Sequence, residues 1–412
     1  PRNESARIRR QLYLLKVKLV QHLYKIIIMK RTSYYSLAAP TSLLLDDDQI
    51  IERVFSHIDN KTTDLGSEVW KEPVRNYIEH ERFDNEIKLL RSLPVPFCPS
   101  SALPEKGSYV SRVAAGTPIL VTRDDENNIN AFINACRHRG MQVASGSGCK
   151  KSFVCPYHGW TYGLKGENRH IPGADGFPGI DPHEHGLKQV NAVEKGGIVY
   201  VCQDGDIDKK FLDETLDYFT EDQVLINQSG IEDEANWKIL HETLLEGYHI
   251  KSLHKDTFYP YGLDNINVVE NYGQNSRVIF PFKRIEKLRD IQPSKRVIDG
   301  TITSVYSLFP NVSISVLSKH TNLVILEPIS PTRSKWVIYT LINKSNRKEK
   351  LSREDAMRDA KFVGDTGQDE DREAARAIQQ TLSTKANDHL TFGYFEKAIV
   401  NFHSHLAKYL DQ

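Results

Sequence analysis

The chain has little cysteine, no excess of either charge and no long apolar run, and each shortage narrows its possible functions. Five cysteines in 412 residues, an odd and sparse set, argue against a disulfide framework and predict a reducing, cytoplasmic location. Lys plus Arg equals Asp plus Glu at 54 each, which gives no reason to expect nucleic acid or a membrane surface as partner. No apolar stretch approaches the roughly 18 residues that cross a bilayer.

Two motifs are also missing. The sequence holds no G-x-G-x-x-G dinucleotide fingerprint and no additional cysteine-rich cluster motif, so a nicotinamide cofactor would have to act through a separate protein. It shows neither internal repeats nor low-complexity segments, and its length is sufficient for two domains of ordinary size.

The first 45 residues differ from the rest in charge, because they hold nine Arg or Lys and one acidic residue, Glu4. We expect residues 1–45 to form a basic N-terminal extension. Three interpretations of it stay open: translated sequence upstream of a start at Met29, a targeting segment, or a basic arm of the protein.

The remaining pattern changes twice along the chain. Residues 46–93 read as a helical segment, with Asp46-Asp47-Asp48 as a cap and helical spacing from Ser67 to Leu93. Residues 94–204 read as short strands and turns, which predicts an all-β domain. Residues 205–412 hold consecutive strands between 266 and 342, then helical stretches at 369–386 and 389–410, which predicts an α+β domain with an antiparallel sheet.

Two short segments of the all-β region each pair one cysteine with one histidine: Cys136-Arg-His138 and, after sixteen residues, Cys155-Pro-Tyr-His158. Two thiolates suit one iron of a [2Fe–2S] cluster and two imidazoles suit the other. A zinc site is a weaker alternative, because zinc fingers pair Cys with Cys and His with His. Four buried residues without any metal are the remaining alternative.

A second group of metal-ligand residues follows in the mixed domain. His249 and His254 are five residues apart, a spacing that does not place them on one face of a regular helix. Both could reach one ion only if the helix breaks between them. A carboxylate from elsewhere would then complete a two-histidine, one-carboxylate iron site with positions open for dioxygen.

Asn134-Ala-Cys136-Arg-His138-Arg-Gly140 and Cys155-Pro-Tyr-His158-Gly-Trp160 resemble the cluster-binding loops of the Rieske non-haem iron oxygenases, the family of aromatic ring-hydroxylating dioxygenase alpha subunits. Respiratory Rieske proteins carry an extra cysteine in each loop, and neither is present here. The resemblance implies a Rieske all-β domain with a [2Fe–2S] cluster, followed by a catalytic domain of helix-grip type with a mononuclear Fe(2+).

The same resemblance implies roles for residues of the mixed domain. Glu246 fills the acidic position that bridges an iron-ligand histidine and a cluster-ligand histidine of a neighbouring subunit, here His249 and His158. Glu370-Asp371, with Gln379 and Leu382-Ser383, resembles the family's third-ligand helix, with Asp371 as ligand; Asp365 and Asp369 stay open as alternatives. One departure is Glu242, which stands where the family often has Asn.

The function implied is that of a terminal oxygenase. It would use O2 and electrons relayed from NADH or NADPH through a flavin and [2Fe–2S] reductase, and form a homotrimer. Hydroxylation, dihydroxylation and oxidative demethylation stay open, as does the substrate, an aromatic compound or, as Glu246 slightly favours, a quaternary amine. The alternatives are an electron-transfer protein with a non-catalytic second domain and a non-redox metal hydrolase or binding module.

Overall fold

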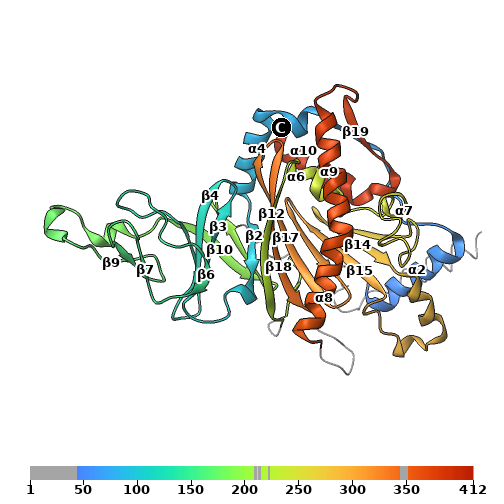
Figure 1. Cartoon of the computed structure of the whole chain (residues 1–412), viewed down its shortest axis with the longest axis horizontal. Coiled ribbons are helices and arrows are strands. Elements are labelled where there is room, and N and C mark those ends of the chain that lie inside the picture. The colour runs from blue at the N-terminus through green and yellow to red at the C-terminus, as the bar shows by residue number, and fades with distance from the viewer. Residues whose placement is uncertain (1–43, 208–210, 212–214, 221–222, 344–350, 412) are drawn as a thin grey trace, which may run out of the picture. The chain divides into compact units, whose positions relative to one another are not determined.

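The computed structural model describes residues 44–411 except 208–210, 212–214, 221–222 and 344–350, so residues 1–43 of the expected basic extension lie outside the described residues (Figure 1). The elements before the first domain are α2 (Asp47–Asn60), β1 (Trp70–Pro73), α3 (Arg75–Ile78) and α4 (His80–Ser92). No helix among these described residues is both long and apolar enough to span a membrane.

The prediction of helix throughout Ser67–Leu93 and 389–410 is wrong at one end of each stretch. Trp70–Pro73 is strand β1, which pairs antiparallel with β19 (His389–Phe392), so that Trp70 lies opposite Phe392. Only after β19 does the last helix, α10 (Lys397–Leu410), begin. Helical spacing within either segment cannot reveal a pairing partner so far along the chain, and strand formation depends on such partners.

The all-β region folds as predicted, around one seven-stranded sheet with the strand order β2-β11-β10-β5-β4-β3-β6. A turn at 124–128 joins two of these strands, and in it the Asp124 carboxylate accepts hydrogen bonds from the backbone N–H groups of Glu126 and Asn128. A small three-stranded sheet, β7-β8-β9, carries the second Cys–His segment. The strands are β2 (Val95–Pro99), β3 (Ser108–Ala114), β4 (Thr117–Arg123), β5 (Ile129–Ile133), β6 (Gly146–Cys149), β7 (Phe153–Val154), β8 (Thr161–Tyr162), β9 (Asn168–His170), β10 (Gln189–Lys195) and β11 (Ile198–Cys202).

The mixed region is built on a seven-stranded antiparallel sheet with the order β12-β18-β17-β16-β15-β14-β13. Six of its strands were predicted; the exception is β12, whose largely exposed residues lack a clear apolar alternation. Helices α8 and α10 contact the sheet (Figure 1), α8 at β17 and β18 and α10 at β13 and β14. Ser352 caps α8 by accepting a hydrogen bond from Asp355 N. The elements are β12 (Leu225–Asp233), α6 (Trp237–Glu242), α7 (Ile250–Leu253), β13 (Val268–Tyr272), β14 (Asn275–Pro281), β15 (Ile302–Leu308), β16 (Val312–Val316), β17 (His320–Ser330), β18 (Arg333–Ile342), α8 (Arg353–Val363), a π-helical turn (Gly364–Gln368) and α9 (Asp369–Leu382).

The two large sheets share a hydrophobic core, in which Phe97 and Val110 of the first pack with Ile314 and Leu323 of the second. An ion pair crosses the same junction: Arg112 Nη1 lies 2.6 Å from Glu327 Oε1, and both side chains are more than nine-tenths buried. The face of the second sheet that carries Leu323 is therefore covered by the first sheet. The opposite face is left for helices and for a cavity.

Candidate metal centres and active site

The two Cys–His segments form loops with the same backbone hydrogen bonds. Cys136 N donates to Met141 O at 2.8 Å, and Cys136 O accepts from Gly140 N at 2.8 Å. Cys155 repeats this register, since its N donates to Trp160 O at 2.8 Å and its O accepts from Gly159 N at 3.0 Å. Gly140 and Gly159 have φ values of +79° and +77°, a conformation that favours glycine. The two loops are thus near-identical clamps that each present one thiol and one imidazole.

The side chains of these loops converge as a cluster site requires. The rings of His138 and His158 lie 4.6 Å apart, and the thiols of Cys136 and Cys155 are buried. Burial is the main cause that raises the pKa of the Cys155 thiol, whereas backbone N–H groups of Tyr157 and His158 lower it and would stabilise a thiolate. His138 Nδ1 is buried with no hydrogen-bond partner, which metal coordination would satisfy. The four residues therefore fit a cluster with two cysteine and two histidine ligands.

The segment with His249 and His254 differs from the predicted broken helix. Helix α6 ends at Glu242, and the single turn of α7 lies between the two histidines, with His249 at its N-cap and His254 at its C-cap. The helix is therefore interrupted before His249, and the backbone between His249 and His254 is helical. Because each histidine stands at an end of this short turn, both rings can face the same point.

Asp371, from α9, completes the group. The Nε2 atoms of His249 and His254 lie 3.2 Å apart, and Asp371 Oδ1 lies 3.5 Å and 3.0 Å from them. Among the described residues, these three form a group whose ligand atoms all lie within 4.8 Å of one another. Asp371 Oδ1 is buried and makes no hydrogen bond at all. Three potential ligand atoms that converge on one point fit a metal ion held on one side.

Two further carboxylates hold the outer nitrogens of these rings. Glu246 contacts His249 Nδ1, and Glu370 Oε2 lies 2.7 Å from His254 Nδ1. Burial lowers the pKa of both imidazoles, but the negative charge of Asp371 and the hydrogen bonds that the rings make to Glu246 and Glu370 outweigh it, so both pKa values are raised. The group thus favours positive charge at its centre, as a cation site should.

The alternative third ligands lie elsewhere. The side chain of Asp365 is 59% exposed and pairs with Lys361, and that of Asp369 is 61% exposed and pairs with Arg372. The side chain of Asp371 is only 9% exposed. Of the three aspartates, the structure brings Asp371 to the two histidines.

Glu242 faces away from this group, into a buried polar network. Its Oε1 accepts a hydrogen bond from Tyr77 OH at 2.8 Å and lies 2.8 Å from His403 Nε2. Burial raises the pKa of Glu242 to about 8 and lowers that of His403 to about 4. Sequence reasoning singled out Glu242 as a departure from the family but had no means of pairing it with residues so distant in the chain.

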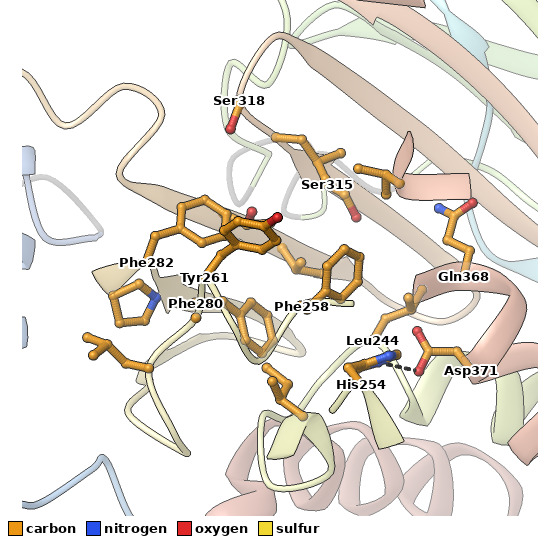
Figure 2. A pocket seen from close by; sticks show the side chains of 18 of the residues that line it. Leu244, His254, Phe258, Tyr261, Phe280, Phe282, Ser315, Ser318, Gln368 and Asp371 are labelled. Carbon is orange, nitrogen blue, oxygen red and sulfur yellow. Dashed lines mark ion pairs between the residues drawn. The ribbon is translucent and has the colours of Figure 1, made fainter. Parts of the chain in front are cut away.

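A cavity of about 310 Å³ opens beside the candidate iron site. Figure 2 shows His254 and Asp371 at one end of it and Ser318 and Phe282 at the other. Five aromatic side chains form part of its wall: Phe258, Tyr261, Phe280, Phe282 and Phe362. The charged and polar residues that line it outside the candidate iron site include Arg284, Asp359 and Gln368.

Several residues of the sheet face away from this cavity. Tyr306, Val316 and Leu323 lie instead in the core between the two sheets, and Phe309 packs in a second core. Their neighbours in sequence Val305, Ser315 and Leu317 line the cavity. Neighbouring residues of a strand point to opposite faces, so only one alternating set of residues on these strands can line the cavity.

Comparisons with known proteins agree with this architecture. Residues 94–190 match the model of the Rieske [2Fe-2S] domain, and residues 226–412 match that of the ring hydroxylating alpha subunit (catalytic domain). Choline monooxygenase from Atriplex hortensis is 27% identical over 332 residues, which cover 76% of this chain and 71% of that protein. The oxygenase subunit of glycine betaine monooxygenase from Chromohalobacter salexigens is 37% identical over 161 residues, 37% of this chain and 36% of that one.

Solved structures share the fold. The quaternary ammonium Rieske monooxygenase CntA in complex with L-carnitine has a TM-score of 0.68 and 19% identity, and covers 84% of this chain and 96% of its own. Naphthalene 1,2-dioxygenase from Rhodococcus sp. has the same TM-score and the same identity, and the match covers 90% of this chain and 99% of that one. With the two domain models in series along the chain, these findings establish that the protein belongs to the Rieske non-haem iron oxygenases and is a terminal oxygenase component with a [2Fe–2S] cluster and a mononuclear iron.

Proposed function

We propose that Cys136, His138, Cys155 and His158 hold the cluster, and that His249, His254 and Asp371 hold the catalytic iron. When bound, the cluster supplies single electrons and the iron binds and activates dioxygen. The observation that carries the proposal is the convergence of two imidazoles and one unpartnered carboxylate oxygen beside an aromatic cavity. A complete triad of this kind also disfavours an electron-transfer protein with a non-catalytic second domain.

Glu246 is the proposed link between the two centres. Its carboxylate contacts His249 Nδ1 and also accepts hydrogen bonds from the backbone N–H groups of Tyr248 and His249, which fix its position. His158 is exposed at the tip of its loop. We infer that a homotrimer forms, in which His158 of one subunit approaches Glu246 of the next, and that a reductase supplies the electrons from NADH or NADPH.

The substrate class that we favour is a small quaternary amine. Relatives named choline monooxygenase and glycine betaine monooxygenase support it, as does the cavity itself. Aromatic faces attract cations, and the Asp359 carboxylate lines the same space as Phe258, Tyr261, Phe280 and Phe282. The reaction would be hydroxylation or oxidative demethylation, in which O2, two electrons and two protons yield the oxidised product and water.

An aromatic acid is the second candidate. Anthranilate 1,2-dioxygenase from Acinetobacter baylyi is 30% identical over 196 residues, and Arg284 lines the cavity as a group that could pair with a carboxylate. A product screen by mass spectrometry, with a generic reductase and panels of quaternary amines and aromatic acids, separates the two. The cytoplasmic location expected from the sparse cysteines stays a prediction.

The link through Glu246 has its own test. We expect Glu246→Ala to keep both metals and to lose turnover with reductase and substrate, because the contact between His249 and a second subunit is gone. Metal analysis and the cluster spectrum test whether the iron and the cluster are kept, and oxygen uptake measures turnover. Full activity in this variant would rule out the bridging role, and a monomeric mass in solution would rule out the trimer.

A further inference from the structure

The imidazole of His254 is held at both of its nitrogens by consecutive residues of α9. Asp371 Oδ1 lies 3.0 Å from Nε2, and Glu370 Oε2 lies 2.7 Å from Nδ1. The ring is only 2% exposed, so neither nitrogen has ready access to solvent as an alternative partner. The same oxygen of Glu370 also accepts a hydrogen bond from Thr257 Oγ1 at 2.6 Å.

These contacts decide where the His254 proton resides. An ionised carboxylate can only accept hydrogen bonds, so the Glu370 contact requires the proton on Nδ1. Nε2 of a neutral ring then keeps its lone pair, and that lone pair points to the atom of Asp371 that makes no hydrogen bond. Without Glu370 the neutral ring could protonate either nitrogen, and the Nε2-protonated form cannot bind a metal through Nε2.

We propose that Glu370 is a positioning residue for the iron site, which fixes His254 in the Nδ1-protonated tautomer and strengthens Nε2 as a ligand. The inference rests on the proposed iron site. His249 has the equivalent partner in Glu246, so each imidazole is backed by its own carboxylate. Glu370 differs from Glu246 in that it belongs to the helix of the third ligand, and α9 thus delivers one ligand and the orientation of another. Carboxylates behind metal-binding histidines commonly act in this way.

The test compares metal affinity in variants of the full chain that carry the cluster and have lost the mononuclear iron to a chelator. We expect Glu370→Ala to weaken Co(II) binding about 10- to 100-fold, the usual effect of losing such a partner. Glu370→Gln keeps an acceptor and removes the charge, so its loss should be smaller. Glu373→Gln, an exposed glutamate of the same helix, is the matched control and should bind Co(II) as the wild type does.

Two readouts separate positioning from a merely structural tie. Thr257→Val removes the loop's hydrogen bond to Glu370 but leaves the carboxylate on His254, so it should retain most of the affinity. NMR of protein labelled with 15N-histidine should show His254 protonated at Nδ1 in the wild type and in Thr257→Val, and a tautomer mixture in Glu370→Ala. An unchanged tautomer with unchanged affinity in Glu370→Ala overturns the inference, as does an equal loss in Thr257→Val.

The outcome is distinguishable from a failure of the proposed iron site. His254→Ala should abolish specific Co(II) binding if the site is correct, whatever Glu370 does. Retained binding in His254→Ala would refute the site itself, and with it the inference. Loss in His254→Ala together with no change in Glu370→Ala refutes only the role of Glu370. Cluster absorbance, which belongs to the other domain, verifies that each variant is folded.

Discussion

Asp371 has a nearby acidic residue, Asp369, that makes a matched control for a single-residue test. We expect Asp371→Ala to lose the mononuclear iron while the cluster spectrum stays, because a buried oxygen near both imidazoles disappears. Iron content after desalting measures this. Asp369→Ala breaks only an exposed ion pair with Arg372 and should keep its iron. Unchanged iron in Asp371→Ala would move the third ligand to Asp369 or Asp365.

The raised pKa of Glu242 allows a second single-residue test, in which stability is measured against pH. Burial raises the pKa of Glu242 from 4.5 to about 8. Between these two pH values the carboxyl group is protonated in the folded state and ionised in the unfolded chain. This group therefore stabilises the fold fully below about pH 4.5 and loses that contribution as pH rises through 8. In urea titrations, wild type should lose stability relative to Glu242→Gln over this window, by at most about 1.4 kcal/mol per pH unit.

The control for that comparison is Glu373→Gln, which changes an exposed glutamate. It should follow the wild-type curve at every pH. A constant difference between wild type and Glu242→Gln from pH 5 to 8 would mean that the carboxyl is ionised in the folded state.

Single residues also show where sequence reasoning stopped. The cluster and iron residues belong to short motifs with characteristic spacing, and for this reason they could be singled out without a structure. Glu370 went without a role although it adjoins Asp371, because its partners His254 and Thr257 come from another element. The partners of Glu242, Tyr77 and His403, lie near opposite ends of the described chain and leave no local pattern.

At the scale of elements, the π-helical turn Gly364–Gln368 depends on one of its two glycines. A Cβ on Gly367 would lie 1.8 Å from the ring of Phe258, which itself packs 5.0 Å from His254. Gly367→Ala should therefore push Phe258 into the cavity and cost about 1–3 kcal/mol of stability, as overpacking usually does. Thermal unfolding and substrate affinity measure the two effects.

Gly364→Ala is the matched variant in the same turn, since the nearest atom to its new Cβ would be 3.9 Å away. It should leave both stability and affinity close to wild type. Equal behaviour of the two variants would show that Phe258 can move aside without consequence, and that the turn does not shape the cavity.

Elements set by local periodicity were predicted more reliably than those set by distant partners. The antiparallel strands β13–β18 and the cap of α8 follow from alternation and from Ser352. Strands β1 and β19 pair with each other, and each is only four residues long, too short for its own alternation to reveal the pairing. The α7 turn could not be predicted from the sequence either, because contacts with Glu246 and Glu370 hold the two histidines at its ends.

At the scale of the whole molecule, the junction of the two large sheets contains the buried Arg112–Glu327 pair. We expect Glu327→Ala to lower the free energy of unfolding by about 3–5 kcal/mol, because Arg112 is left charged and buried. Urea unfolding followed by cluster absorbance and by tryptophan fluorescence measures both domains. Glu232→Ala removes an exposed pair with Arg333 and should cost at most about 1 kcal/mol. Similar losses in the two variants would contradict a stabilising junction.

The account as a whole depends on a histidine- and cysteine-bound cluster that feeds a second iron. Low-temperature electron paramagnetic resonance of the anaerobically reconstituted and reduced protein tests it most directly. The wild type should give the signal of a [2Fe–2S] cluster with two histidine ligands, and His138→Ala should lose it while keeping mononuclear iron. A wild type without sulfide-bridged iron, or a His138→Ala variant with an unchanged signal, would contradict the account.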